Sequence, residues 1–200
     1  MKNIDQAIKI LKKGGIVVYP TDTAYGLAVD ATNVAAVKKL YQLKGRDFKN
    51  PIHVIPPSKA SIGIFARISP WSQKLIDRLM PGPLTIVLPL KAKGQSWKML
   101  SAGTGTIGVR LPKHRIALDL AKKLGQPITT TSANLSGKPI CYSIADFKNQ
   151  LDKSIYARIY VLDGGKLRKI QPSTVVSLIG RVKILRPGPI SETQIKKVLK

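Results

Sequence analysis

Two basic residues, Lys44 and Arg46, lie close together in the sequence and could bind an anion. They follow a predicted helix and lie two positions apart. If that segment is extended, both side chains project from the same face and form a pincer for a polyphosphate. A solvated Lys-Gly-Arg turn is the simpler interpretation of this pair alone, so the hypothesis depends on other polar stretches of the chain.

The strongest of these stretches covers residues 129–136, directly after a predicted strand. Six of its side chains can form hydrogen bonds: Thr129, Thr130, Thr131, Ser132, Asn134 and Ser136. Such a loop can cradle phosphate or ribose with its hydroxyl, amide and free backbone N–H groups. It can equally form turns in which the side chains bond to their own backbone.

Other polar residues stand where predicted strands begin or end. Arg110 lies on an otherwise apolar strand, so it must meet an anion or lie on a solvated face. Ser173 begins one strand and Arg186 ends another. Residues 21–23, all with short hydrogen-bonding side chains, follow the apolar strand 16–20. Because α/β folds hold ligands at strand ends, these positions predict a ligand site.

Net charge is the most unusual property of the composition. The chain has 34 Lys and Arg residues against 10 Asp and Glu residues, a formal charge of +24. Such a field attracts polyanions, nucleic acid above all. A surface decorated with lysine for solubility explains the charge equally well. We therefore expect a phosphate-rich ligand or partner, whose identity the charge leaves open.

Hydrophobic periodicity, together with the proline and glycine positions, predicts alternating helices and strands. Helices are expected at 4–13, 34–43, 70–80, 115–124, 144–151 and from 192. Strands are expected at 16–20, 52–55, 85–90, 107–111, 128–131, 158–162, 174–178 and 182–185. Since no internal repeat or linker occurs, we expect one mixed α/β domain over residues 1–200.

Composition also excludes several classes of protein. No run approaches the roughly 18 apolar residues of a membrane span, and no long apolar segment follows Met1, so a secretory signal is not expected. With two histidines and one cysteine, Cys141, neither an internal disulfide nor a Cys/His zinc site can form. We expect a cytoplasmic protein without a metal site of its own.

Seven motifs occur in an order that resembles the YrdC/TsaC family, the threonylcarbamoyl-AMP synthases of tRNA modification. They are PTDTAYGL, KGR, PGPLT, VRLP, TSANLSG, PSTVV and LRPG. The resemblance runs from about residue 5 to residue 190. It implies a twisted mixed sheet with flanking helices around a large basic concave cleft. The chain ends near residue 200, which predicts the short form without the C-terminal domain of longer relatives.

The resemblance also implies a reaction. L-Threonine and CO2 or bicarbonate form a carbamate, whose oxygen attacks the α-phosphate of ATP. Diphosphate leaves and threonylcarbamoyl-AMP results. A downstream threonylcarbamoyl-transferase complex then modifies the adenosine next to the anticodon in tRNAs that read codons beginning with A. The attacking oxygen comes from substrate, so the protein needs no nucleophile of its own. Mg2+ is expected with ATP, held mostly by the phosphates.

Roles follow residue by residue from the same resemblance. The family's KxR falls on Lys44 and Arg46, which are expected to be catalytic, and its SxN falls on Ser132 and Asn134. All four are expected to bind the ATP phosphates. Further nucleotide contacts are implied at Asn50, Thr106, Ile140 (through its backbone) and Arg186. The implied L-threonine contacts are Thr23, Arg110, Thr130 and Ser173. Arg110 is the natural clamp for the threonine carboxylate, because its planar fork matches a carboxylate.

The chain departs from the family pattern near its first histidine. Longer relatives often carry a histidine where Ile55 stands here, two positions beyond His53. We interpret His53 as a structural or surface residue. Cys141, near the SxN loop, is interpreted as a packing residue. The aromatic residues Phe65, Trp71 and Trp97 are likewise expected to pack rather than to stack on adenine.

Two other functions stay open. A double-stranded RNA or tRNA-binding module without chemistry of its own would use the same basic concavity, and direct tRNA binding could also accompany catalysis. Carbamoyl transfer to another acceptor, as in the related domain of hydrogenase-maturation proteins, is the second alternative. That domain occurs in longer chains with zinc-finger-like cysteines, which this sequence lacks.

Overall fold

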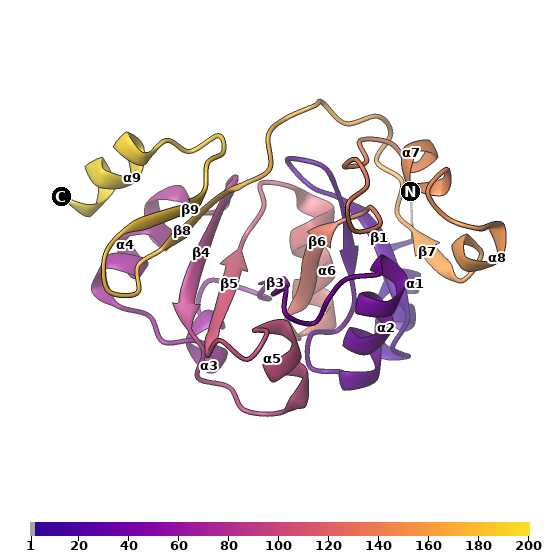
Figure 1. Cartoon of the computed structure of the whole chain (residues 1–200), viewed down its shortest axis with the longest axis horizontal. Coiled ribbons are helices and arrows are strands. Elements are labelled where there is room, and N and C mark those ends of the chain that lie inside the picture. Colours follow the sequence, from indigo (N-terminus) through magenta and orange to yellow (C-terminus); the bar gives the residue numbers. More distant parts are fainter. Residues whose placement is uncertain (1–2) are drawn as a thin grey trace.

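A twisted, mixed sheet of nine strands forms the centre of the part of the chain that the computed structural model describes, residues 3–200 (Figure 1). The strand order is β7-β1-β2-β6-β3-β5-β4-β8-β9. The strands are β1 (Ile16–Pro20), β2 (Tyr25–Ala28), β3 (His53–Ile55), β4 (Leu84–Pro89), β5 (Thr106–Arg110), β6 (Ile128–Ser132), β7 (Ile159–Val161), β8 (Thr174–Ser177) and β9 (Lys183–Arg186).

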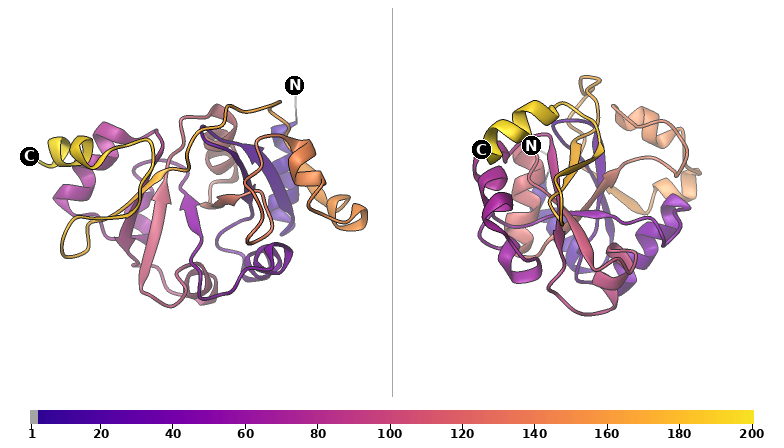
Figure 2. Two further views of the ribbon diagram at one scale, coloured as in Figure 1. Left: turned by 45° about the horizontal axis from the view of Figure 1, so that its top comes forward. Right: turned by 60° about the vertical axis from the view of Figure 1, so that its left-hand side comes forward.

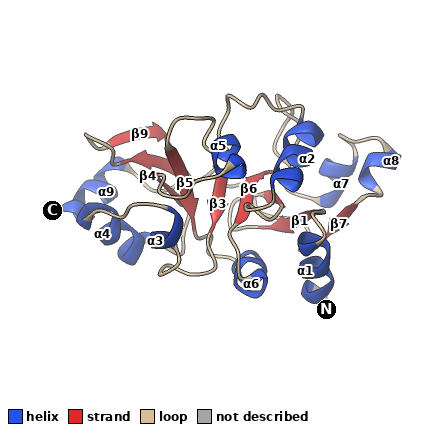
Figure 3. Cartoon of the chain, turned by 90° about the horizontal axis from the view of Figure 1, so that it is seen from below, coloured by secondary structure: helices blue, strands red, loops and turns tan. Residues whose placement is uncertain are grey.

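Helices cover both faces of this sheet. They are α1 (Ile4–Lys12), α2 (Val34–Lys44), α3 (Ile62–Phe65), α4 (Pro70–Leu79), α5 (Gln95–Leu100), α6 (Arg115–Leu124), α7 (Ile144–Lys148), α8 (Lys153–Tyr156) and α9 (Glu192–Leu199). Figure 3 shows α2 and α5 on the opposite side of the sheet from α1, α4 and α6. The C-terminal helix α9 packs beside α4, at the end of the molecule away from α1 (Figure 2).

Local sequence signals account for these helices. Asn3 and Asn33 cap α1 and α2 by accepting hydrogen bonds from Gln6 N and Ala36 N. Ser69 and Ser143 form capping boxes at α4 and α7. Buried apolar residues at helical spacing then fix the longer helices, such as α1, α4 and α6, to the rest of the core.

A tight turn at Thr21–Ala24 makes β1 and β2 an antiparallel hairpin. The Thr21 hydroxyl donates to Ala24 O (2.7 Å) and accepts from Thr23 N and Ala24 N. The side chain of Thr21 therefore serves its own turn. The turn reverses the direction of the chain, so β2 runs back along β1 and its other edge pairs with β6.

Every predicted helix and strand forms, with small shifts at the ends. The helix predicted for 144–151 is too long, because α7 ends at Lys148 and the short α8 follows. Strand β2 and helices α3, α5 and α8 are not predicted from the sequence. Strand β2 is only four residues long and α3 and α8 are single turns, so their periodicity is too short to recognise.

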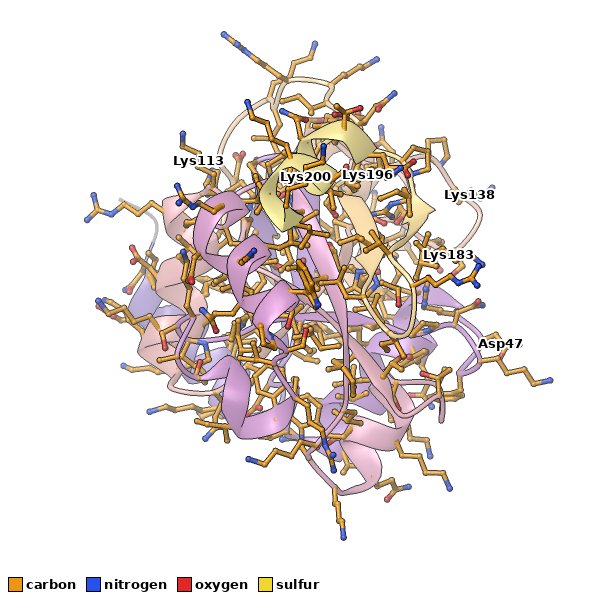
Figure 4. All side chains as sticks on the ribbon, turned by 90° about the vertical axis from the view of Figure 1, so that its left-hand side faces the viewer. Asp47, Lys113, Lys138, Lys183, Lys196 and Lys200 are labelled. Atoms are coloured by element: carbon orange, nitrogen blue, oxygen red, sulfur yellow. The ribbon has the colours of Figure 1, made fainter. Side chains whose placement is uncertain are left out.

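Lysine side chains cover much of the outside of the molecule. Figure 4 shows Lys113, Lys138 and Lys183 projecting from its periphery, and all three are exposed. None of the helices within residues 3–200 has the length and apolar character that crossing a membrane requires.

Candidate active site

A cavity of about 540 Å3, a volume typical of small-molecule sites, opens over the sheet. Most of the site residues predicted from the sequence line it. They are Thr23, Arg46, Thr106, Arg110, Thr130, Ser132, Ile140, Ser173 and Arg186. Lys44, Asn50 and Asn134 lie outside the lining. Three arginines of the lining make the cavity basic, as the sequence predicts.

The pleat of the sheet explains why these residues meet. Alternate residues of β5, Thr106, Gly108 and Arg110, face the cavity. His53 of β3 pairs directly with Thr130 of β6, and both line the cavity floor. Because β3 and β5 are also neighbours in register, residues from three distant parts of the chain form one floor.

Arg110 is buried, with 7% of its surface exposed, and one of its amino groups is already engaged. Its Nη2 donates to Asp22 Oδ1 and to Thr23 Oγ1 (3.0 Å). The other Asp22 oxygen accepts from Lys113 N (2.9 Å). Arg110 Nε is buried and has no hydrogen-bond partner in the described protein. A buried unpaired donor is costly, so the protein satisfies this guanidinium only in part.

Ser173 and Arg186 form a second fixed pair, separated from Arg110 by Thr85, the partner of Arg110 on the neighbouring strand β4. Arg186 donates to Ser173 O from Nε (3.1 Å) and from Nη2 (2.8 Å), and Nη2 also reaches Ser173 Oγ (3.1 Å). The buried hydroxyl of Thr85 lies 2.9 Å from the same Ser173 oxygen. Thr85, in the PGPLT motif, was not singled out as a site residue by the sequence analysis.

Lys44 and Arg46 do not form the predicted pincer. Lys44 is the last residue of α2, and Gly45 ends the helix in the left-handed conformation (φ 58°). The segment is therefore not extended, and the two side chains point to different places. Arg46 alone lines the cavity, where its Nε and Nη2 donate to Asn50 O (3.2 Å) and Pro51 O (3.0 Å). The exposed Asn50 thus contributes its carbonyl to holding Arg46.

Lys44 instead lies under the loop that follows β6. It is 2% exposed, and its Nζ donates to Ser132 O (2.6 Å), Asn134 O (2.5 Å) and Asn134 Oδ1 (3.2 Å). Burial, and then the nearby Arg46, lower its pKa to about 7. The loop is also bonded internally, since Ser132 Oγ donates to Asn134 Oδ1 (2.6 Å) and Asn134 Nδ2 donates to Lys138 O (2.6 Å). Lys44 therefore fixes the shape of the SxN loop.

His53, interpreted from the sequence as a structural or surface residue, lines the cavity. Burial, followed by the charges of Arg186, Arg46 and Arg110, lowers its pKa to about 4. The ring is therefore neutral near pH 7. Side chains alternate between the two faces of a strand, so His53 lies on the same side of β3 as Ile55, where longer relatives often have their histidine. This alternation is the signal that could have identified His53 as a cavity residue.

The packing residues behave largely as expected. Phe65 and Trp97 are buried and stacked, with ring centroids 5.1 Å apart, whereas Trp71 is 53% exposed. Cys141 is buried, which raises the pKa of its thiol to about 11. None of the three aromatic residues lines the cavity.

The family model Sua5_yciO_yrdC, described as "Telomere recombination", matches residues 9–188. The chain belongs to this family. Threonylcarbamoyl-AMP synthase of Bacillus subtilis (strain 168) is 37% identical over 198 residues, which are 98% of this chain and 56% of that relative. The L-threonine complex of P. abyssi Sua5 is similar with a TM-score of 0.89 and 34% identity, over 98% of this chain and 56% of that chain.

A more distant likeness is full-length HypF in its phosphate- and nucleotide-bound form. Its TM-score is 0.80 at 26% identity, over 95% of this chain and 30% of that one. This chain spans 56% of the curated synthases from Bacillus subtilis and Pyrococcus abyssi. The family resemblance of the motifs and the mixed α/β fold are thus confirmed.

Proposed function

We propose that this chain makes L-threonylcarbamoyladenylate from L-threonine, CO2 or bicarbonate and ATP, and releases diphosphate. The observation that carries the proposal is a cavity with two electrostatically different parts. We call Thr23, Arg110, Thr130 and Ser173 the threonine end, and Arg46, Thr106, Ser132 and Arg186 the nucleotide end. L-Threonine bound to a similar chain, P. abyssi Sua5, supports the first assignment.

The threonine end is suited to a zwitterion. Asp22 offsets the charge of Arg110, so the pair is close to neutral, as a free amino acid is. The guanidinium of Arg110 lines the cavity, and its Nη1, which is bonded to neither Asp22 nor Thr23, can take the carboxylate of L-threonine. Hydroxyls of Thr23, Thr130 and Ser173 then offer hydrogen bonds to the remaining polar groups of the substrate.

The nucleotide end is suited to a polyanion. Arg46 and Arg186 are held by neutral backbone carbonyls, so their positive charges stay available for phosphates. Lys44 and Asn134 hold the loop that presents Ser132. We assign Arg46 the catalytic role of stabilising charge at phosphorus, and Lys44 the role of aligning ATP through the loop that it holds. Asn50 and the Ile140 backbone are given secondary nucleotide contacts.

The chemistry needs positioning more than it needs a reactive side chain. The carbamate oxygen of threonine attacks the α-phosphorus, and the bond to diphosphate breaks. Residues 3–200 hold no group of three or more His, Cys, Asp or Glu that could bind a metal. Mg2+ would therefore enter with the ATP phosphates, as part of the substrate. We place the reaction in the cytoplasm, and its product would pass to a downstream threonylcarbamoyl-transferase complex that acts on tRNA.

Diphosphate release from ATP tests the proposal. It is measured with L-threonine and bicarbonate together and with each omitted. We expect release that depends on both. Folded protein that releases no diphosphate in the complete mixture contradicts the proposal, and release that ignores L-threonine favours transfer to another acceptor.

The charge of +24 favours a second candidate, direct binding of tRNA or double-stranded RNA. Binding driven by phosphate contacts weakens steeply as salt rises and needs no L-threonine. Titration of tRNA at low and moderate salt, with and without L-threonine, measures both properties. RNA binding that is absent at low salt contradicts this candidate.

A further inference from the structure

His53 stands between the two ends of the cavity. On one side it pairs directly with Thr130 of the threonine end, and Ser132 of the nucleotide end lies two residues further along β6. On the other side it lies over Gly108, which separates Thr106 from Arg110 on β5. His53 is therefore at the midpoint of the floor, where two bound substrates would meet.

Gly108 provides the space that the imidazole occupies. A Cβ atom at position 108 would lie 2.3 Å from His53 Cδ2 and 2.8 Å from its Cγ, far inside contact distance. Gly108 is not among the glycines with positive φ, so the backbone does not itself require glycine here. Its lack of a side chain serves the histidine ring.

The ring has unused hydrogen-bonding capacity. Among the described residues, the imidazole of His53 makes no hydrogen bond. Its two ring nitrogens are also not fully enclosed by protein without a partner, unlike Nδ1 of His114. Burial, and then the charges of Arg186, Arg46 and Arg110, lower the pKa of His53, so the ring stays neutral. A neutral imidazole has one N–H donor and one acceptor nitrogen, and this ring lines the cavity with its Cδ2–Nε2 edge beside Gly108.

We propose that His53 contacts the reacting groups themselves, and that its N–H donates a hydrogen bond to an anionic oxygen where the carbamate of threonine meets the α-phosphate of ATP. The inference rests on the proposed function. In the step that it assists, the carbamate oxygen forms a bond to phosphorus, and the phosphorus–oxygen bond to diphosphate breaks. Diphosphate leaves with the bonding electron pair, and His53 keeps its proton throughout. Its role is hydrogen-bond donation to developing charge.

Two substitutions test this role by kinetics. His53→Leu removes the N–H, and His53→Gln replaces it with an amide that can still donate. We expect His53→Leu to lower kcat for threonine-dependent diphosphate release about tenfold or more, the usual worth of a donor aimed at transition-state charge. KM for both substrates should change much less, and His53→Gln should recover part of the rate. Leu and wild-type proteins with equal kcat would overturn the inference.

Gly108→Ala provides a test that leaves the histidine in place. The added methyl group must displace the ring, so we expect a loss of kcat similar to that of His53→Leu. Combining the two changes should then add little, because both remove the same contact. Fully additive losses would contradict a shared contact. Thermal unfolding of each variant checks that the protein is folded.

A spectroscopic measurement separates this inference from the proposed function. The chain has two histidines, so His114→Gln leaves His53 as the single imidazole. We expect the ring 15N signals of that protein to shift when ATP and L-threonine are added together, whether or not turnover occurs. An inactive wild-type protein would refute the proposed reaction, and unmoved 15N signals would refute the contact at His53.

Discussion

The two ends of the cavity hold their arginines in different ways. At the threonine end a carboxylate, Asp22, binds Arg110 and offsets its charge. At the nucleotide end backbone carbonyls bind Arg46 and Arg186 and leave the full charge of each in place. A carbonyl can orient a guanidinium without neutralising it. The difference divides one basic cavity into a nearly neutral part and a strongly positive part.

This division matches the charges of the two proposed substrates. L-Threonine has no net charge, and a strongly positive site would favour its carboxylate while repelling its ammonium group. ATP carries several negative charges, so uncompensated arginines favour it. The partners of each arginine, more than the number of arginines, therefore determine which substrate each end prefers.

The largest effect is expected from Arg46→Ala at the nucleotide end. It removes a charge that carbonyls only orient, and should lower kcat/KM for ATP by about 2 to 4 kcal/mol. KM for L-threonine should move little. Lys49→Ala is the matched control, because it removes an exposed charge from the same loop. Equal losses in the two variants would mean that the general field of the protein, rather than this end of the cavity, attracts ATP.

Acid should destabilise the folded protein, because burial and the nearby arginines oppose protonation of His53. The pKa of His53 is about 4 in the folded protein and 6.5 without the protein environment. The unfolded chain thus binds more protons between these values, so stability is complete above pH 6.5 and falls as pH falls toward 4. This group should remove about 2 to 3 kcal/mol of unfolding free energy near pH 4.5, and almost nothing further below about pH 3.

Urea unfolding near pH 7 and near pH 4.5 measures the effect. His53→Gln should lose about 2 to 3 kcal/mol less on acidification than the wild type, since carboxylates titrate equally in both proteins. Identical losses would show that the ring is not shielded from protonation.

Arg110→Lys should affect the threonine end of the cavity. Lysine keeps the charge but lacks the planar fork, so it cannot hold both Asp22 and a substrate carboxylate in the same geometry. KM for L-threonine should rise by the equivalent of about 2 kcal/mol, while KM for ATP stays nearly constant. Arg115→Lys, on a side chain that is 93% exposed, is the control. A silent Arg110→Lys variant would remove Arg110 from the threonine end.

The smallest expected effect compares two neighbours on β6. Thr130→Val should weaken use of L-threonine and Ser132→Ala should weaken use of ATP, each by about 1 kcal/mol, because each removes one neutral hydrogen bond. Both substitutions keep the shape of the strand, so the pair distinguishes the two ends within a single element. Steady-state kinetics with each substrate varied in turn measure both constants. A loss of ATP use in Thr130→Val would move the boundary between the ends.

The sequence predicts most of this fold because its longer elements carry clear periodicity and caps. Asn33, Ser69 and Ser143 cap the helices that are predicted to begin at residues 34, 70 and 144. The motifs also identify most of the cavity lining. The KGR motif did not predict the directions of Lys44 and Arg46. Gly45 between them adopts the left-handed conformation that ends α2, and the motif alone does not specify where the helix ends.

Long-range partners are the other part that the sequence could not supply. Asp22 and Arg110 lie 88 residues apart and meet only because the β1–β2 hairpin faces the end of β5. His53 and Gly108 likewise meet through strand register. Neither pair leaves a pattern in a single sequence, because the spacing along the chain carries no information about neighbours across a sheet.

The most direct test of the two-ended cavity is the identity of its product. The protein is incubated with ATP, L-threonine and 13C-bicarbonate, and the adenylate fraction is analysed by mass spectrometry with 12C-bicarbonate as the control. We predict threonylcarbamoyl-AMP that carries one heavy carbon, formed by the wild type and strongly reduced in Arg46→Ala and Arg110→Lys. AMP or an adenylate without threonine and the label would contradict the claim that this cavity joins the two substrates.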